Sequence, residues 1–330
     1  MIWHEWFQYS KKLIKKRKKL KRGLINLVVF YTSLIIACNV FAYDSSQRSW
    51  IALLDTGVSQ DHLKIPVLGQ VDLSSKEKVI NLSFSTKDIQ APHDGGFRMG
   101  NELIPHGSWV AQSMANTMQA INPVALRNWS LLSMRIIDSE KGAHPASVIA
   151  ALMWIDEITS DPEHKNQIKI IAIPAGTFSE YASDQIQVLL TKLSQKGILI
   201  FASVGNDRAD HMTIPARLND VISVTRLSKS NELYEYANTG EKWTLGLNPD
   251  ISVGVTVWNP FRNTMVNSGG TSLSVGEVTA YAAYWVNTFP NQTRDINAFS
   301  QWIKSSCNSQ HTMIKTQQVY VIRSIISRAC

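Results

Sequence analysis

Cysteine is nearly absent from this chain, since only three cysteines occur among 330 residues. There is no Cys-x-x-Cys pair and no cluster of histidine and cysteine, so nothing in the sequence indicates zinc, and no metal site is predicted. Apart from Cys38, the remaining cysteines are Cys307 and Cys330. An oxidising compartment could join them in a disulfide, or they could stay two free thiols.

Clustered positive charge is missing from most of the chain. The net charge is +7, but nine lysines and arginines and one glutamate give residues 1–42 a charge of +8, which leaves −1 for the remaining residues. Binding to a nucleic-acid backbone requires clustered Lys and Arg on the folded surface. The nearly neutral charge of residues 43–330 therefore argues against a nucleic-acid binder. It also argues against a membrane-tethered nucleic-acid binder, an interpretation that only the basic run would support.

Residues 23–42 contain no charged side chain and directly follow the basic run. A basic run, an apolar run and a small residue such as Ala42 are typical of an export signal. Three fates are open: cleavage after Ala42, a lipidated Cys38 after "IIAC", or a membrane anchor over residues 24–42. We therefore expect export to the bacterial periplasm, the cell envelope or the medium.

Short apolar runs alternate with amphipathic stretches over the rest of the chain. Runs that are apolar on both faces are typical of buried parallel strands. The alternation predicts an α/β fold with three α/β/α layers around a mostly parallel sheet, and a site beyond the carboxyl ends of the strands. Residues 64–104 and 228–270 fit less well and are expected to hold loops and short antiparallel strands. The expected strands are 49–55, 131–138, 168–176, 197–205 and 220–227, and the expected helices begin near 106, 145, 181 and 274.

The stretch "WIALLDTGVSQDHL" contains Asp55-Thr56-Gly57, which two protease chemistries could use. A pepsin-like aspartic protease needs a second Asp-Thr/Ser-Gly, because two carboxylates share one proton. No second copy is present, and the alternation of strands and helices does not fit the short all-β units of dimeric aspartic proteases. The aspartic protease interpretation is therefore disfavoured.

A serine protease needs a hydroxyl, an imidazole, an orienting carboxylate and donors for an oxyanion. The chain offers Asp55 at the end of a strand, His106 at the start of a helix, and Asn206 after another strand. Ser272 follows two glycines at a helix start. The order Asp, His, Ser is one of the known orders for this triad.

These four motifs, in this order, make the sequence resemble the subtilase family of subtilisin-like serine proteases (peptidase family S8). The family's aspartate and histidine motifs match "IALLDTGVSQDH" and "HGSWVA". Its strand ending in Gly-Asn matches "ILIFASVGN", with Pro215-Ala216 nine residues later, and its nucleophile motif matches Gly270-Thr271-Ser272. The resemblance covers about residues 48–290 and implies one peptidase domain over 43–330, with 291–330 as a C-terminal extension.

The resemblance implies a role for each of the four residues. Ser272 would be the nucleophile, His106 the general base and then acid, and Asp55 the carboxylate that fixes the imidazole tautomer. Asn206 would donate its side-chain amide to the oxyanion, together with the Ser272 backbone N–H.

The resemblance also implies that a peptide substrate pairs with "IIAIPAG" and that this strand and "ASVGN" form its first pocket. Pro174 stands where the family usually has serine, and it keeps a carbonyl acceptor but has no N–H. The small residues could equally serve ordinary strand packing. The candidate substrate-binding residues are Ala172, Pro174, Ala175, Gly176, Ala202 and Gly205.

Some family features are missing. After Ser272 the chain reads "LSVGEVTA" where the family usually has Met-Ala-x-Pro-His-Val-Ala-Gly. Too few residues lie between Ala42 and the strand of Asp55 for an N-terminal propeptide. No cofactor is identifiable, and calcium is implied only by the resemblance. We expect an exported serine endopeptidase that acts on peptides or proteins; the alternative is a catalytically silent protein of the same fold that binds peptides or partners.

Overall fold

A computed structural model describes residues 48–140, 142–240, 242, 244–247, 256–305, 309–314 and 317–322. Residues Arg48–Cys330 form one compact unit. The predicted export segment, Cys38, Cys307 and Cys330 lie outside the described residues, so the predictions about them stay predictions. No helix within the described ranges is long and apolar enough to cross a membrane.

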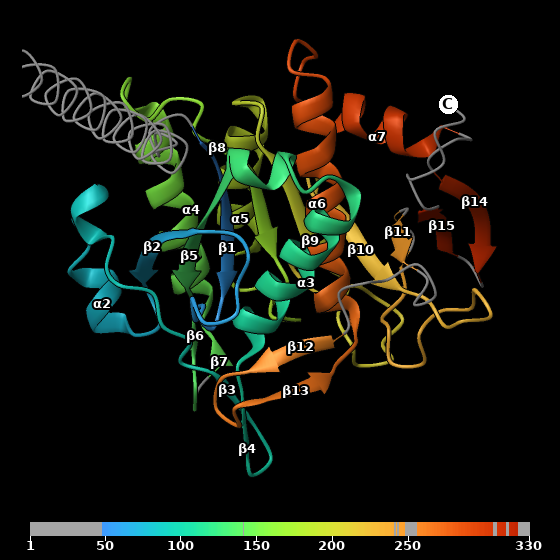
Figure 1. Cartoon of the computed structure of the whole chain (residues 1–330), viewed down its shortest axis with the longest axis horizontal. Helices are drawn as coiled ribbons and strands as arrows, with labels where there is room; N and C mark the ends of the chain where they lie inside the picture. The colour runs from blue at the N-terminus through green and yellow to red at the C-terminus, as the bar shows by residue number, and fades with distance from the viewer. Residues whose placement is uncertain are drawn as a thin grey trace, which may run out of the picture. The chain divides into compact units, whose positions relative to one another are not determined.

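Nine of the described strands form the central sheet, in the order β14-β15-β11-β10-β9-β8-β1-β5-β2 (Figure 1). All neighbours pair in parallel except β14 and β15, which are antiparallel. The predicted α/β fold with a mostly parallel sheet is therefore confirmed. The strands are β1 (Ser49–Asp55), β2 (Val67–Asp72), β5 (Trp129–Arg135), β8 (Ile168–Ile173), β9 (Leu199–Ser203), β10 (Ile222–Arg226), β11 (Thr244–Leu247), β14 (Ser309–Ile314) and β15 (Gln317–Ile322).

Helices cover both faces of this sheet. Side chains of β1 alternate between the faces, because successive residues of a strand point in opposite directions. Ile51 and Leu53 belong to the apolar core under α3 (His106–Ile121), α6 (Thr271–Thr288) and α7 (Ile296–Lys304). Ala52 and Leu54 belong to the core under α4 (Pro145–Ser160) and α5 (Ser183–Gln195).

Helix α7 contributes a large aromatic side chain to the first of these cores. Phe299 is fully buried and meets Phe201 of β9 and Trp285 of α6 edge-on, at 5.5 Å between ring centroids in each pair. Residues after 290 therefore form part of the core that supports α6.

Residues 64–104 and 228–270, which fit the alternation of strands and helices poorly, contain more regular structure than expected. Two antiparallel hairpins are present, as predicted, but β2 and β11 join the main sheet as parallel strands. The remaining elements are α2 (Lys76–Ile80), η2 (Thr86–Asp88), β3 (Phe97–Met99), β4 (Glu102–Ile104), η3 (Ala125–Asn128), β6 (Ile137–Asp138), β7 (Gly142–Ala143), β12 (Thr256–Asn259) and β13 (Thr264–Asn267).

The carboxyl ends of the parallel strands lie along one edge of the sheet. The hairpins β3–β4 and β12–β13 lie on the same side, at the bottom of Figure 1. Asp55 ends β1, Pro174 directly follows β8, and Asn206 follows β9 after two residues. The topology therefore brings these residues to one edge of the sheet, where ligand sites of such sheets occur.

Candidate active site

Asp55 and His106 form a hydrogen-bonded pair at this edge. Asp55 is fully buried at the end of β1, and the Nδ1 atom of His106 lies 2.8 and 2.9 Å from its two carboxylate oxygens. Asp55 Oδ1 also accepts a hydrogen bond from the Thr56 N–H at 2.7 Å. With Nδ1 donating to a carboxylate, the neutral imidazole keeps an unprotonated Nε2, which is the form that a general base requires.

Nearby charges shift the pKa of His106. Burial acts to lower this pKa, but the negative charge of Asp55, its hydrogen bond to the ring and the charge of Asp94 outweigh burial and raise the pKa above its usual value. The surroundings therefore stabilise the imidazolium that forms when His106 accepts a proton.

Asp94 is a second buried carboxylate that holds the start of α3. The helix begins at His106, and its N-cap residue Pro105 makes no side-chain capping bond. Asp94 substitutes for this cap, since its Oδ2 accepts the Ser108 N–H at 2.8 Å and its Oδ1 accepts the Thr56 hydroxyl at 2.7 Å. A carboxylate at a helix N-terminus is favoured by the helix dipole, so Asp94 fixes the backbone that carries the imidazole.

Ser272 lies in the first turn of α6 and is 7% exposed. Its hydroxyl donates to the backbone oxygen of Pro174 at 2.9 Å, and no hydrogen bond between Ser272 and His106 occurs in the described part of the structure. The N-cap residue is Gly270, with φ of 109°, and it makes no side-chain capping bond. The backbone N–H of Ser272 has no hydrogen-bond acceptor among the described residues, so it is available to an anion.

Asn206 lies beside this helix start and is exposed. Its Oδ1 accepts both the backbone N–H and the hydroxyl of Thr271, each at 3.1 Å. This orientation leaves the Nδ2 donors of Asn206 without an acceptor in the described ranges. Two hydrogen-bond donors, the Asn206 amide and the Ser272 N–H, therefore flank the N-terminus of α6 without an acceptor among the described residues.

Asn238 holds the loop that carries Asn206. It is fully buried, and its Oδ1 accepts the N–H groups of Asp207 and Ala209 at 2.8 and 3.0 Å. Its Nδ2 donates to the Val204 carbonyl at 3.0 Å. Neither Asn238 nor Asp94 was identified from the sequence, because each acts through contacts to residues distant in sequence and lies in no recognisable motif.

The six candidate substrate-binding residues differ in their surroundings. Ala172 and Ala202 have no exposed surface, and their side chains pack in the two cores. Pro174 accepts the Ser272 hydroxyl, whereas Ala175 and the exposed Gly176 border the surface. The sixth residue, Gly205, accepts the Asn238 N–H at 3.1 Å through its carbonyl oxygen.

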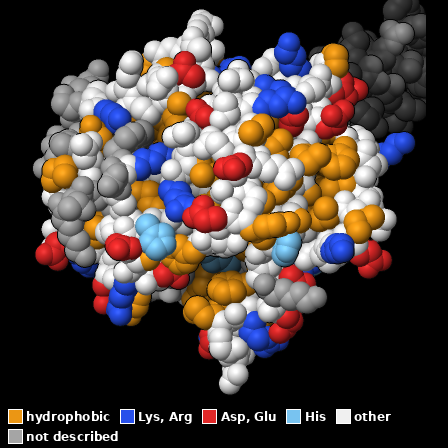
Figure 2. Space-filling model, turned by 180° about the vertical axis from the view of Figure 1, so that it is seen from behind, with side chains coloured by type: hydrophobic (Ala, Val, Ile, Leu, Met, Phe, Trp, Pro, Cys, Tyr) orange, Lys and Arg blue, Asp and Glu red, His pale blue; other side chains and the backbone are white. Residues whose placement is uncertain are grey.

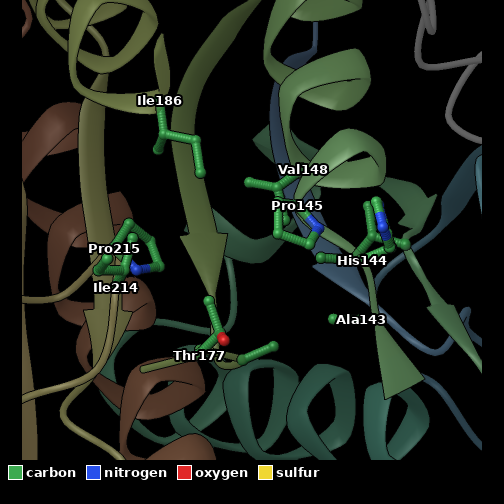
Figure 3. A pocket seen from close by; sticks show the side chains of 11 residues that line it. Ala143, His144, Pro145, Val148, Thr177, Ile186, Ile214 and Pro215 are labelled. Atoms are coloured by element: carbon green, nitrogen blue, oxygen red, sulfur yellow. The ribbon is translucent and has the colours of Figure 1, made fainter. Parts of the chain in front are cut away.

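A small apolar cavity of about 20 Å³ lies beside Ala175 and Gly176. Figure 3 shows that its walls come from the start of α4, from α5 and from the segment after β9. Ile214 in this segment pairs with Thr177 through two backbone hydrogen bonds of 2.8 and 2.9 Å. The other lining residues are Ile136, Ala143, His144, Pro145, Val148, Ile186 and Pro215.

A second apolar hollow shares His144 with this cavity and is lined by side chains that include Ile149, Met153 and Tyr181. Tyr181 is 73% exposed, and the face seen in Figure 2 carries grouped hydrophobic side chains next to charged ones. Apolar surface therefore continues from the cavity onto the outside of the molecule.

Within the described ranges, one group of residues has side chains placed as a metal site requires: Asp161, Glu163 and His164. It follows the C-terminal end of α4, whereas the cavity lies at the start of that helix. The two acids are exposed, and such groups are common without a bound ion. The group is not part of the candidate active site, and calcium binding stays a prediction.

Residues 46–321 match the sequence profile of the family described as the subtilase family. The chain is 22% identical over 246 residues to a thermostable alkaline protease of Halalkalibacterium halodurans. The alignment covers 74% of this chain and 58% of that protein. It is also 22% identical over 271 residues to the major intracellular serine protease of Bacillus subtilis. This alignment covers 77% of this chain and 74% of that protein. The chain thus spans less than two thirds of the first of these relatives.

A solved protease structure from Pseudoalteromonas arctica superposes with a TM-score of 0.61 at 17% identity, over 85% of this chain and 89% of that chain. At this level of identity, the likeness concerns the fold.

Proposed function

Because the chain belongs to the subtilase family, we propose that it is an exported serine endopeptidase in which Ser272, His106 and Asp55 form the catalytic triad. The observation that carries the proposal is the pairing of His106 with the buried Asp55 at the same sheet edge as Ser272. The N–H of Ser272, at a helix start, has no acceptor among the described residues. Each of these groups matches a role that acyl transfer requires.

The first chemical step needs a rotation of the Ser272 side chain. Its hydroxyl leaves the Pro174 carbonyl and donates to Nε2 of His106, which takes the proton as the oxygen attacks the substrate carbonyl. A carbon–oxygen bond forms, and the carbonyl π electrons move onto oxygen. The imidazolium then gives its proton to the leaving amine as the peptide bond breaks, and water hydrolyses the acyl-enzyme by the same route.

The tetrahedral intermediate carries a negative oxygen that needs hydrogen-bond donors. The Ser272 N–H at the positive end of the α6 dipole and the Nδ2 group of Asn206 supply them. The bonds from Thr271 to Asn206 Oδ1 fix the orientation of this amide before substrate binds. Little reorganisation is then required when the charge forms.

We propose that a substrate peptide lies along Pro174, Ala175 and Gly176 in an extended conformation. The backbone N–H and C=O of Gly176 make no hydrogen bond within the described residues and can pair with such a strand. The adjacent apolar cavity would accept an apolar side chain of the peptide. Because this cavity is small, substrates with a small apolar residue upstream of the cut bond should be preferred.

Export is proposed from residues 11–42 and is tested by mass spectrometry of the mature N-terminus. A start at Tyr43 would support a cleaved signal, a lipidated Cys38 a lipoprotein, and an intact Met1 in the membrane fraction an anchor. A full-length chain found only in the soluble cytoplasmic fraction would contradict all three.

Labelling by a fluorophosphonate probe tests the proposed chemistry. The full chain should be labelled, and Ser272→Ala should abolish labelling, because only an activated serine reacts with the probe. Ser274→Ala is the matched control, since this serine lies in the same helix turn but is fully buried, and labelling should persist. A folded wild type that never reacts would instead favour the catalytically silent alternative.

A further inference from the structure

A buried ion pair joins β10 to the proposed nucleophile helix α6. Arg226 ends β10, and Glu277 lies in α6, five residues after Ser272. Their side chains are 6% and 1% exposed, and Nη1 of Arg226 lies 3.6 Å from Oε1 of Glu277. Glu277 stands where the subtilase family usually has histidine after the nucleophile, so the pair is not part of the family motif.

The pair is held by charge and not by a hydrogen bond. A separation of 3.6 Å is too long for a hydrogen bond, and the buried Nη1 atom of Arg226 has no hydrogen-bond partner among the described residues. Removing two charges from water is costly, and a buried ion pair is often no more stabilising than apolar side chains of similar volume. Stability alone therefore does not account for the pair, which supplies a directional link between β10 and α6.

The packing of α6 needs such a link. This helix packs against β9 and β10, most of its side chains are buried, and Glu277 is its only charged residue (Figure 1). Apolar burial is non-directional, so it defines the position of a helix along its own axis weakly. On the face toward α3, the hydrogen bond from Ser113 to the Leu273 carbonyl holds the helix. On the face toward the sheet, Arg226 holds it through Glu277.

Arg226 also lies beside the two glycines that precede the proposed nucleophile. An added Cβ at Gly269 would lie 3.7 Å from Nε of Arg226, and one at Gly270 would lie 3.5 Å from Oδ1 of Asn206. The two glycines are therefore flanked by Arg226 and Asn206. Strand β10 pairs in parallel with β9, the strand that leads to Asn206. Arg226 thus connects the start of α6 to the part of the sheet that carries the proposed oxyanion donor.

We propose that Arg226 and Glu277 are positioning residues, and that their ion pair fixes α6 on the sheet and thereby sets the place of the Ser272 side chain and N–H. The effect on catalysis rests on the proposed function, whereas the effect on the position of α6 does not.

Replacement of the whole pair separates position from stability. Arg226→Met/Glu277→Leu puts apolar side chains in place of both charges, so its Tm, measured in a Ser272→Ala background that prevents self-digestion, should stay within roughly 5 °C of the parent. In the active enzyme its kcat should nevertheless fall by about 10- to 100-fold with KM within about threefold, because small displacements of reacting groups are costly.

The single variant Arg226→Met should behave differently in stability. Its kcat should fall as in the double variant, but its Tm should drop by roughly 6–20 °C, because the Glu277 carboxylate then lies buried beside an apolar side chain. A single and a double variant with equal Tm would contradict an ion pair between these side chains.

Asp156→Leu/Lys192→Met is the matched control. Asp156 of α4 and Lys192 of α5 form an ion pair of 2.6 Å between two helices on the other face of the sheet. Its kcat should stay within about twofold of wild type, because distant sites act independently. A loss of kcat equal to that of the Arg226→Met/Glu277→Leu variant would overturn the proposal.

Crystal structures test the position of α6 without catalysis. The Ser272→Ala parent and the same protein with Arg226→Met/Glu277→Leu should differ by at least roughly 0.5 Å at residues 269–272 relative to β9, since catalytic groups must be held within about this distance. An unmoved segment, or a double variant that does not fold, would overturn the proposal. A moved segment with unchanged kcat would contradict the effect on catalysis. An inactive wild type would contradict the proposed function, and the two crystal structures would still decide the positioning role.

Discussion

Two buried aspartates act on the same histidine in different ways. Asp55 contacts the imidazole of His106, whereas Asp94 contacts the backbone of the helix turn that carries it. Burial raises the pKa of Asp94 above its usual value, and the hydrogen bonds from Ser108, Thr56 and Gly96 act in the opposite direction. Only Asp55 has the geometry to fix the tautomer; Asp94 adds charge and a helix cap.

The first prediction concerns the pH dependence of Asp94→Asn. The charge of Asp94 raises the pKa of His106, so removing it should lower that pKa. The proposed mechanism requires the neutral imidazole, and the acid limb of the kcat/KM profile should therefore move to lower pH in the variant. Measurement of kcat/KM against pH for both enzymes checks this shift.

Asp156→Asn provides the control, because it removes the same charge from α4, where Asp156 pairs with Lys192 and Lys196. Its profile should match that of the wild type. An acid limb of Asp94→Asn that stays in place or moves to higher pH would contradict the electrostatic role of Asp94.

The second prediction concerns the oxyanion donor. Asn206→Ala should reduce kcat by about 100- to 1000-fold with little change in KM, because the lost bond forms mainly in the transition state. Steady-state kinetics on a peptide substrate measure this effect. Asn219→Ala, in the exposed loop after the cavity wall, is the control and should remain within a few-fold of wild type. A rise in KM without a fall in kcat would assign Asn206 to substrate binding instead.

Among the elements, the contact between α3 and α6 determines how closely His106 and Ser272 approach. Ser113 of α3 donates to the Leu273 carbonyl of α6 at 3.2 Å. At Gly276, an added Cβ would lie 2.6 Å from the Val110 carbonyl oxygen of α3. A glycine at this position therefore allows the close approach of the two helices that carry the proposed nucleophile and base.

The third prediction follows from this contact. Gly276→Ala should push the helices apart, lower the Tm by roughly 2–10 °C and reduce kcat by about 10- to 100-fold, because small displacements of reacting groups are costly. Thermal unfolding and kinetics of the same preparation measure both effects. Gly240→Ala is the control, since its Cβ would lie 3.2 Å from the Met212 side chain and no nearer than 3.7 Å to the Met212 backbone. A full-activity Gly276→Ala enzyme would show that the helix spacing is not limiting.

The elements that could be predicted from the sequence are those whose residues are buried on both sides. β1, β8 and β9 read as continuous apolar runs, and they pair at the centre of the sheet. β2 and β11 contain Gly69 and Gly246, which weaken a strand pattern, so their place in the sheet depends on pairing with distant neighbours. The proposed catalytic residues were predictable because each follows a local motif, whereas Asp94 and Asn238 were not.

For the molecule as a whole, the buried Lys169 and the half-buried Lys242 link stability to alkaline pH. Burial lowers the pKa of Lys169 to about 8, and the charge of Arg294 acts in the same direction. Burial also lowers the pKa of Lys242 to about 8. The unfolded chain, with lysine pKa near 10.5, binds more protons between these values, so the free energy of unfolding should rise as pH increases from about 8 to about 10.5.

The fourth prediction concerns Lys169→Met in the Ser272→Ala background. It should be more stable than its parent by about 1–3 kcal/mol at pH 7, because a buried charge that makes no hydrogen bond to any described residue is removed. This difference should shrink by pH 10, where the parent lysine is neutral in the folded state. Urea unfolding at both pH values measures it, and Lys165→Met, at an exposed lysine, should show no such trend. A difference that is constant with pH would argue against titration of Lys169.

The position of Phe299 also has a consequence for the order of events during synthesis. This side chain packs under α6 from a helix that follows every proposed catalytic residue in the chain. When Ser272 has emerged from the ribosome but Phe299 has not, helix α6 lacks the aromatic side chain that packs against it. If Ser272 acts as proposed, activity should therefore appear only after Phe299 has been synthesised and has packed against α6.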